Sequence, residues 1–196
     1  MSQRHIGNIT VTATTAHSFP AAAEFFGHLT IAAGVTLTAP KLTMIRGWLT
    51  LEPGASLTAP TLGLVDGWLT LQFGASLSAI HLTEVRNDLT LTGNSPDVDP
   101  EDPAFVETAF EGEALVTAGA INLQRNADYG FPSLTEVKDG ITLAQGASLG
   151  APLLTRIGKS LTLREKAWLG APELAFIGGY IDCDESARLI APRFTN

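Results

Sequence analysis

The sequence predicts an all-β fold: a right-handed parallel β-solenoid of about nine coils, interrupted by one inserted loop. Three observations predict it. A phrase of 20 residues recurs along the chain, its copies open on an apolar–Thr–apolar triplet, and Gly and Pro return at fixed places in each copy. A fixed period of this length is typical of repeat proteins, in which each unit stacks on the next. The right hand is the usual one for parallel strand crossovers.

The first strand of each coil is predicted from a triplet such as Leu49-Thr50-Leu51. Its alternation matches the period of two of a short strand with one wet face. Thr holds the middle place in seven of nine triplets. The triplets begin at Ile9, Leu29, Leu49, Leu69, Leu89, Ile121, Ile141, Leu161 and Ile181.

Two further extended sides are predicted within each coil. The second carries a row of Leu and ends at a Pro, which is expected at a corner because it has no N–H for a ladder. The third carries Leu followed by Val or Ile, and Gly47, Gly67 and Gly179 are expected to turn the chain into the next coil. Residues 21–26 are expected to form one helical turn near the N-terminal end. The second row consists of Leu37, Leu57, Leu77, Leu149, Leu169 and Leu189.

The repeats predict a single domain, 1–196, with end coils or caps at 1–28 and 181–196. Every step between triplets is 20 residues except that from Leu89 to Ile121, which is 32. The extra residues fall in an acidic, Pro-rich insertion placed at 93–114. It is either a solvated loop without chemistry or a partner-contacting loop, since insertions in repeats often lie at the binding face.

Charge and composition exclude several classes of protein. The net charge of −8 argues against a nucleic-acid binder, which would need a basic stripe, and suits a basic partner. The lone Cys183 cannot form an intramolecular disulfide. No apolar run suggests a signal peptide or a membrane span, so we expect no membrane partner and a cytoplasmic location, with signal-less export left open.

Part of the phrase resembles the leucine-rich repeats in their loose bacterial form and the L-domain repeats of receptor ectodomains. The resemblance lies in segments such as Ala59-Pro60-Thr61-Leu62-Gly63-Leu64-Val65-Asp66-Gly67 and Ala151-Pro152-Leu153-Leu154-Thr155-Arg156-Ile157-Gly158. The Asn ladder of the usual pattern is largely missing, which favours a straight, compact rod over a wide horseshoe. Such repeats are commonly protein- or glycan-binding modules, and the resemblance implies a similar role here.

The leading candidate site is an exposed face formed by Trp48, Trp68, Thr50 and Thr70. If the triplets are strands, the two Trp side chains stack on neighbouring coils and project to the same side as the Thr row. Exposed Trp pairs are typical of protein hot spots and of sugar platforms. The alternative is that both Trp side chains pack against a corner or under the inserted loop.

A second candidate site is the acidic insertion, with Asp97, Asp99, Glu101 and Asp102. A calcium site there is not supported, because Asp102 takes the place of the Gly that an EF-hand requires. No metal, cofactor or catalytic set is predicted. Asp182 and Asp184 could serve as carboxylates of a polysaccharide enzyme, but charge that blocks edge-to-edge stacking at the end of the rod explains them more simply.

The sequence therefore suggests a non-enzymatic scaffold that binds a protein partner through the Trp and Thr side chains and the acidic loop. An immunity or effector role against a basic partner is one form of this hypothesis. The alternatives are a glycan-binding or glycan-cleaving β-helix and, from the Thr row, an ice-binding protein. Self-association through the solenoid ends is also possible in principle, since such ends expose strand edges.

Overall fold

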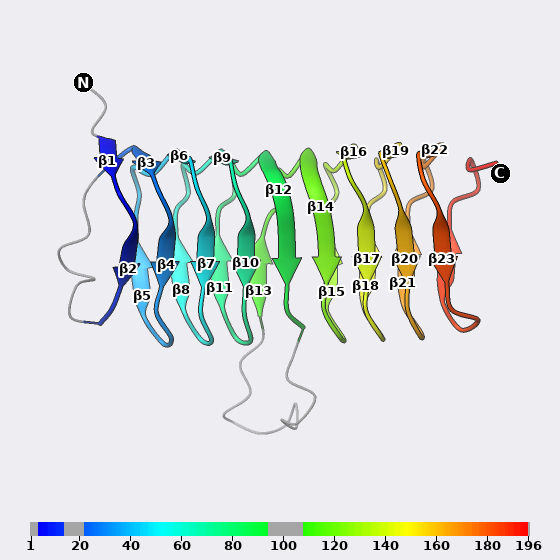
Figure 1. Cartoon of the computed structure of the whole chain (residues 1–196), viewed down its shortest axis with the longest axis horizontal. Coiled ribbons are helices and arrows are strands. Elements are labelled where there is room, and N and C mark those ends of the chain that lie inside the picture. The colour runs from blue at the N-terminus through cyan, green and yellow to red at the C-terminus, as the bar shows by residue number, and fades with distance from the viewer. Residues whose placement is uncertain (1–3, 14–21, 94–107, 196) are drawn as a thin grey trace.

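The structure, a computed structural model, describes residues 4–13, 22–93 and 108–195. These residues form a parallel β-solenoid without helix (Figure 1). In Figure 1 the nearer strands run downward, the more distant strands run upward, and the chain advances from left to right. The coil is therefore right-handed, as predicted.

The first face contains one strand from every coil. Neighbouring strands pair in parallel with a register shift of one repeat, so that Leu49 lies opposite Leu69 and Thr50 opposite Thr70. The strands of this face are β2 (Ile9–Val11), β4 (Leu29–Ile31), β7 (Leu49–Leu51), β10 (Leu69–Leu71), β12 (Glu84–Leu91), β14 (Thr117–Leu123), β17 (Ile141–Leu143), β20 (Leu161–Leu163) and β23 (Ile181–Cys183).

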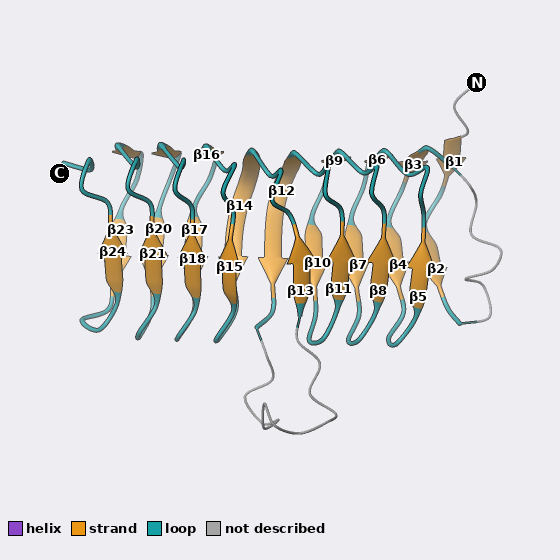
Figure 2. Cartoon of the chain, turned by 180° about the vertical axis from the view of Figure 1, so that it is seen from behind, coloured by secondary structure: helices purple, strands orange, loops and turns teal. Residues whose placement is uncertain are grey.

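The second face lies behind the first and comes to the front in Figure 2. Leu side chains at the middle of its strands point into the rod, and Leu57, Leu77 and Leu149 are fully buried. Its strands are β5 (Thr36–Thr38), β8 (Ser56–Thr58), β11 (Ser76–Ser78), β13 (Ala109–Glu111), β15 (Asp128–Gly130), β18 (Ser148–Gly150), β21 (Trp168–Gly170) and β24 (Arg188–Ile190).

The third side is narrower and joins the first face in one 16-stranded sheet, because β12 and β14 run around the corner without a break. Its inward side chains, among them Ile45, Val65 and Val137, are fully buried. Its separate strands are β1 (Arg4–Ile6), β3 (Glu24–Phe26), β6 (Met44–Ile45), β9 (Leu64–Val65), β16 (Glu136–Val137), β19 (Arg156–Ile157) and β22 (Phe176–Ile177).

Residues 22–26 contradict the predicted helical turn. Residues 24–26 form β3, which pairs with β1 and β6, and residue 21 lies outside the described part of the chain. The reason is the stacking of coils: Phe25 occupies the inward place that Ile45 holds in the next coil, and both are fully buried. Tertiary packing thus overrides the helix propensity of the preceding Ala residues.

The glycines at the entry to the first face are required for a reason other than the predicted turn. Gly47 and Gly67 do not have a positive φ, but a Cβ at either residue would lie closer than 3.0 Å to backbone atoms of the preceding coil. Positive φ occurs at this entry only in the first two described coils, at Gly7 (φ 121) and Gly27 (φ 148), and at the next corner, for example at Gly54 (φ 68) and at the equivalent Asn126 (φ 58). At Gly47 and Gly67 it is therefore close approach of the coils, and not the sign of φ, that requires Gly.

The two ends of the described solenoid differ. At the N-terminal end, His5 takes an inward place and stacks on Phe25 with ring centroids 4.6 Å apart. At the C-terminal end, Ile181 and Leu189 are only half buried, although their counterparts in the preceding coil, Leu161 and Leu169, are fully buried. Self-association through the ends remains a prediction.

Candidate functional site

The strongest candidate site is the part of the first face that we call the Trp–Thr face, made of Trp48, Trp68, Thr50 and Thr70. Each Trp precedes its strand by one residue, Trp48 before β7 and Trp68 before β10, and each Thr is the middle residue of that strand. The parallel register of β7 and β10 places the two Thr side by side. The structure therefore brings together these four residues, which the sequence had singled out.

The aromatic rings form a continuous stack over three coils. The rings of Trp48 and Trp68 are stacked with centroids 4.5 Å apart and an interplanar angle of 25°. On the other side of Trp48 lies the imidazole of His28, 4.0 Å away at 19°. We call His28, Trp48 and Trp68 the aromatic stack. The equivalent residues in the next coils are Asp88 and Ala120, so the stack ends at Trp68.

Both Trp side chains are exposed at the surface, with 41% of Trp48 and 43% of Trp68 accessible. Neither Trp is therefore packed under a corner, and the insertion that was the other predicted cover lies largely outside the described residues. Because His28 and Trp68 cover the two ring faces of Trp48, this Trp presents its edge to solvent. Edges of aromatic rings pack into apolar pockets of a partner, whereas a sugar platform needs an open ring face.

Hydrogen bonds along the chain fix the aromatic stack. The backbone N–H of His28 donates to Asn8 Oδ1 at 2.8 Å, and the backbone N–H of Trp48 donates to His28 Nδ1 at 3.1 Å. Since Nδ1 accepts, the imidazole carries its proton on Nε2. His28 thus holds Trp48 through both its ring and its nitrogen, a role that the sequence did not indicate.

The Thr row continues on both sides of the Trp–Thr face. Thr30, Thr50, Thr70 and Thr90 lie opposite one another on four neighbouring strands. Asn122 and Asp182 interrupt the row further along. A second row of hydroxyls comes from the Thr and Ser residues of β5, β8 and β11, but it lies on the second face and in a separate sheet.

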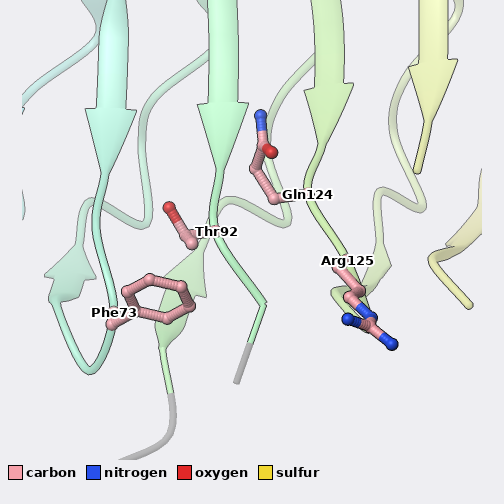
Figure 3. Close-up of a pocket in the computed structure, with 4 residues that line it drawn as sticks. All are labelled: Phe73, Thr92, Gln124 and Arg125. Carbon is pink, nitrogen blue, oxygen red and sulfur yellow. The ribbon is translucent and has the colours of Figure 1, made fainter. Parts of the chain in front are cut away.

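A shallow hollow of about 180 Å³ lies at the ends of β10, β12 and β14, lined by Phe73, Thr92, Gln124 and Arg125 (Figure 3). Small-molecule sites usually have volumes of roughly 300–1,000 Å³, so this hollow is smaller than such sites usually are. Thr92 Oγ1 is engaged in a hydrogen bond to the carbonyl oxygen of Leu71 at 2.8 Å. This hollow is therefore a weak candidate for a ligand site.

The remaining predicted residues fall into two groups. Asp97, Asp99, Glu101 and Asp102 lie outside the described residues, and the acidic loop remains a prediction. The coil resumes at β13, so residues 108–114 of the predicted insertion belong to the solenoid wall. Asp182 and Asp184 both pair with Arg164, at 3.0 and 3.5 Å, which neutralises part of their charge.

Ion pairs run along the third side and reach the corner beside the Trp–Thr face, where Asp66 lies two residues before Trp68. Asp66 pairs with Arg86 at 2.8 Å and Glu84 pairs with Lys138 at 2.9 Å. The hydrogen bond from Lys138 lowers the pKa of the Glu84 carboxyl below its ordinary value of 4.5, although partial burial opposes the shift. Because the pKa of Glu84 is lower in the folded state than in the unfolded state, its ionised carboxylate stabilises the fold at pH values above the ordinary pKa. This contribution is lost as the pH falls from the ordinary pKa through the lowered one.

We expect Lys138→Met to lower the free energy of unfolding by less than about 1 kcal/mol at pH 7, because the ion pair is partly exposed. The difference from the parent should vanish at a pH below the lowered pKa of Glu84, where this carboxyl is protonated in both the folded and the unfolded state. Urea unfolding at the two pH values measures both quantities. Lys41→Met is the matched control, since Lys41 is exposed and forms no ion pair with the described residues. An equal loss at both pH values would mean that the Lys138 side chain acts through packing alone.

The described part of the chain holds no cluster of three or more metal-binding side chains. It also contains no helix of the length and apolar character that a membrane span requires. Comparisons with protein-family models, with curated proteins and with solved structures found no match. What this protein does must therefore be inferred from its own surface.

Proposed function

We propose that this protein is a non-enzymatic repeat scaffold that binds a protein partner through the Trp–Thr face. The observation that carries this proposal is the aromatic stack: two exposed Trp residues lie side by side at the strand entries of neighbouring coils. Trp is enriched among the residues that dominate binding energy at protein interfaces. Other large apolar residues are exposed too, among them Phe73, Ile80 and Tyr180, but Trp48 and Trp68 combine exposure with stacking of their rings on neighbouring coils.

The sheet supports binding by holding the face in one conformation. Backbone N–H groups of Leu29 and Leu49 donate to the carbonyl oxygens of Trp48 and Trp68, both at 2.8 Å. The stack and these hydrogen bonds restrict the Trp side chains before any partner arrives. A pre-organised surface loses less conformational entropy on binding and therefore gains affinity.

The exposed Trp rings and the net charge of this protein indicate the kind of surface that the partner would have. Apolar pockets on the partner would receive the Trp edges, and the Thr hydroxyls would hydrogen-bond to its polar groups. The net charge of −8 favours a partner with a basic surface, because complementary charge speeds encounter. A basic toxin or another basic effector would fit this description, and the acidic insertion would add to the same attraction.

We expect the double substitution Trp48→Ala and Trp68→Ala to weaken partner binding by at least about tenfold, since hot-spot residues each contribute more than 1 kcal/mol, roughly. The test begins with affinity capture from an extract of the native cells, quantified by mass spectrometry. The enriched protein is then titrated against the parent and the double variant, and the two dissociation constants are compared. Trp168→Ala is the matched control, because this third Trp lies on β21 of the second face.

Two results would contradict the proposal. One is a captured protein that binds the double variant and the parent equally. The other is a variant that keeps protein binding and loses retention on a polysaccharide column, which would favour the glycan-binding alternative.

A further inference from the structure

The aromatic stack has one end that no other ring closes, at Trp68. Trp48 lies between His28 and Trp68, whereas Trp68 has a ring neighbour on one side only, with the centroids 4.5 Å apart. Within the described part of the chain, no further ring and no cation stacks on Trp68. We call the side of this ring that is turned away from Trp48 the outer face of Trp68. It is directed along the rod toward the next coil.

The residue at the same place in the next coil is Asp88. Leu69 and Leu89 are paired in register, so the residues that precede them, Trp68 and Asp88, are neighbours on adjacent coils. Asp88 is half buried and lies two residues before Thr90, on the outward side of its strand. A carboxylate therefore lies beside the outer face of Trp68.

The chain supplies no counter-ion for Asp88. This side chain forms no hydrogen bond and no ion pair with the other described residues. The nearest cation along the chain, Arg86, is engaged by Asp66 at 2.8 Å and by Glu84 at 3.5 Å. The negative charge of Asp88 is therefore available to a cation from outside the chain.

The corner beyond Asp88 is short and built from small residues. Val85 and Asp88 lie opposite Ala118 and Ala120, so the sixth coil has one residue fewer at this corner than the fifth. Only Gly119 and Ala120 remain between the third side and the first face in that coil. Their side chains amount to one methyl group, which leaves room beside Asp88 for a long side chain of a partner.

The spacing of the coils suits a guanidinium group on both a ring and a carboxylate. Arg156 Cζ lies 4.1 Å from the ring centroid of Phe176, and these two residues are paired on adjacent strands. Arg86 Nη1 lies 2.8 Å from Asp66 Oδ1, one coil away. The separation of adjacent coils, about 4.8 Å, thus allows each contact within this rod. At Trp68 a ring and a carboxylate are adjacent in the same way, without a guanidinium from the described residues.

We propose that the outer face of Trp68 and the carboxylate of Asp88 together bind an arginine side chain of the protein partner. A guanidinium is planar, stacks on aromatic faces and donates to a carboxylate through a fork of N–H groups, so one Arg engages both residues. Lys has a compact charge without a plane and would engage them less well. This inference rests on the proposed function and names one contact by which the basic surface of the partner is recognised.

The test uses the full chain, isotope-labelled for NMR, and the blocked peptide acetyl-Gly-Arg-Gly-amide as the probe. The three Trp residues give three indole N–H signals, and the signal that disappears in Trp68→Phe belongs to Trp68. The Trp68 signal should shift progressively as the peptide is added in large excess, while that of Trp168, on the second face, stays in place. The same peptide with citrulline, which keeps the shape of Arg without its charge, should shift the Trp68 signal much less.

The role of Asp88 is tested with a matched pair of variants. Asp88→Asn should weaken binding of the Arg peptide by about two- to fivefold, the range for loss of a partly exposed ion pair. Glu185→Gln removes the same charge from an exposed acid that has no ion pair within the described residues. It should leave the affinity unchanged, because Glu185 lies in the last described coil.

Three results would overturn the arginine site: no shift of Trp68 with the Arg peptide, an equal shift with the citrulline peptide, or equal affinity of Asp88→Asn and the parent. A shift of Trp68 with methyl glucoside but not with the Arg peptide would also overturn it and would assign the outer face to a sugar. These measurements do not involve the captured partner. If they fail while the double Trp variant still loses the captured protein, the arginine site is wrong and the proposed function stands.

Discussion

Replacing Gly47 by Ala should destabilise the solenoid by roughly 2 kcal/mol or more, because the new methyl group has no space. A Cβ at this position would lie closer than 3.0 Å to the carbonyl group of Gly27 and to His28 Nδ1. The backbone on either side cannot yield easily, since Leu29 and Leu49 are both tied to the next coil by hydrogen bonds of 2.8 Å. The methyl group must therefore force two coils apart.

Thermal unfolding measures this effect, and a loss of 2 kcal/mol corresponds to a fall of roughly 4–8 °C in Tm for a chain of this size. Gly150→Ala is the control. A Cβ there would have its nearest neighbour, Trp168 Cζ3, at 4.0 Å, and Gly150 does not have a positive φ. That variant should unfold at the parent temperature or slightly above it, because Ala restricts the unfolded chain. If both variants unfold at the same temperature, close contact between coils at Gly47 is refuted.

Replacing Leu149 by Ala should lower the free energy of unfolding by about 2–5 kcal/mol, the range for a fully buried Leu in a packed core. Leu149 is fully buried on β18, and the strands on either side place Tyr129 and Leu169 against it. Loss of its side chain therefore leaves a cavity that touches two neighbouring coils. In a solenoid the stability depends on such contacts between nearest neighbours.

Leu189→Ala is the matched control for this prediction. Leu189 occupies the same place in the last described coil, where it is half buried and has a neighbouring coil on one side only. Its substitution should cost less than half as much, as judged by denaturant unfolding of both variants. Equal losses would show that Leu149 does not lie between two coils, and a loss at Leu189 alone would contradict the order of the stack.

Much of this fold can be read from the sequence because identical positions stack. The triplet that contains Leu49 and Leu51 is a strand with both Leu buried and Thr50 directed outward, as the alternation predicts. The exposed pair of Trp48 and Trp68 follows from the same register, since residues 20 apart must be neighbours. Here periodicity alone determines which side chains meet.

Other features depend on distances between coils, which periodicity does not supply. Gly47 was expected to allow a turn, but it is needed because the backbone of the preceding coil comes too close for a side chain. Residues 24–26 look helical in isolation, and only pairing with β1 and β6 makes them a strand. The stacking of His28 on Trp48 and its acceptor role also require knowledge of side-chain orientation.

The sequence analysis did not predict that the second face is divided into two sheets, one ending at β13 and the other at β15, although the sequence carries a signal for it. Phe110 and Tyr129 are aromatic residues in a row that is Leu in the other coils described, and Phe110 lies within the only step between triplets that is longer than 20 residues, from Leu89 to Ile121. Larger inward side chains at a junction need more room than Leu side chains. A break in the residue type of an inward row is therefore a useful indication of a break in the stacking.

Hydroxyl-radical footprinting of the captured complex tests most directly whether a protein partner binds through the Trp–Thr face. Mass spectrometry follows the oxidation of each Trp with and without the bound partner. Partner binding should reduce oxidation of Trp48 and Trp68 and leave that of Trp168, on the opposite face, unchanged. Unchanged oxidation of Trp48 and Trp68 in a saturated complex would contradict binding through this face.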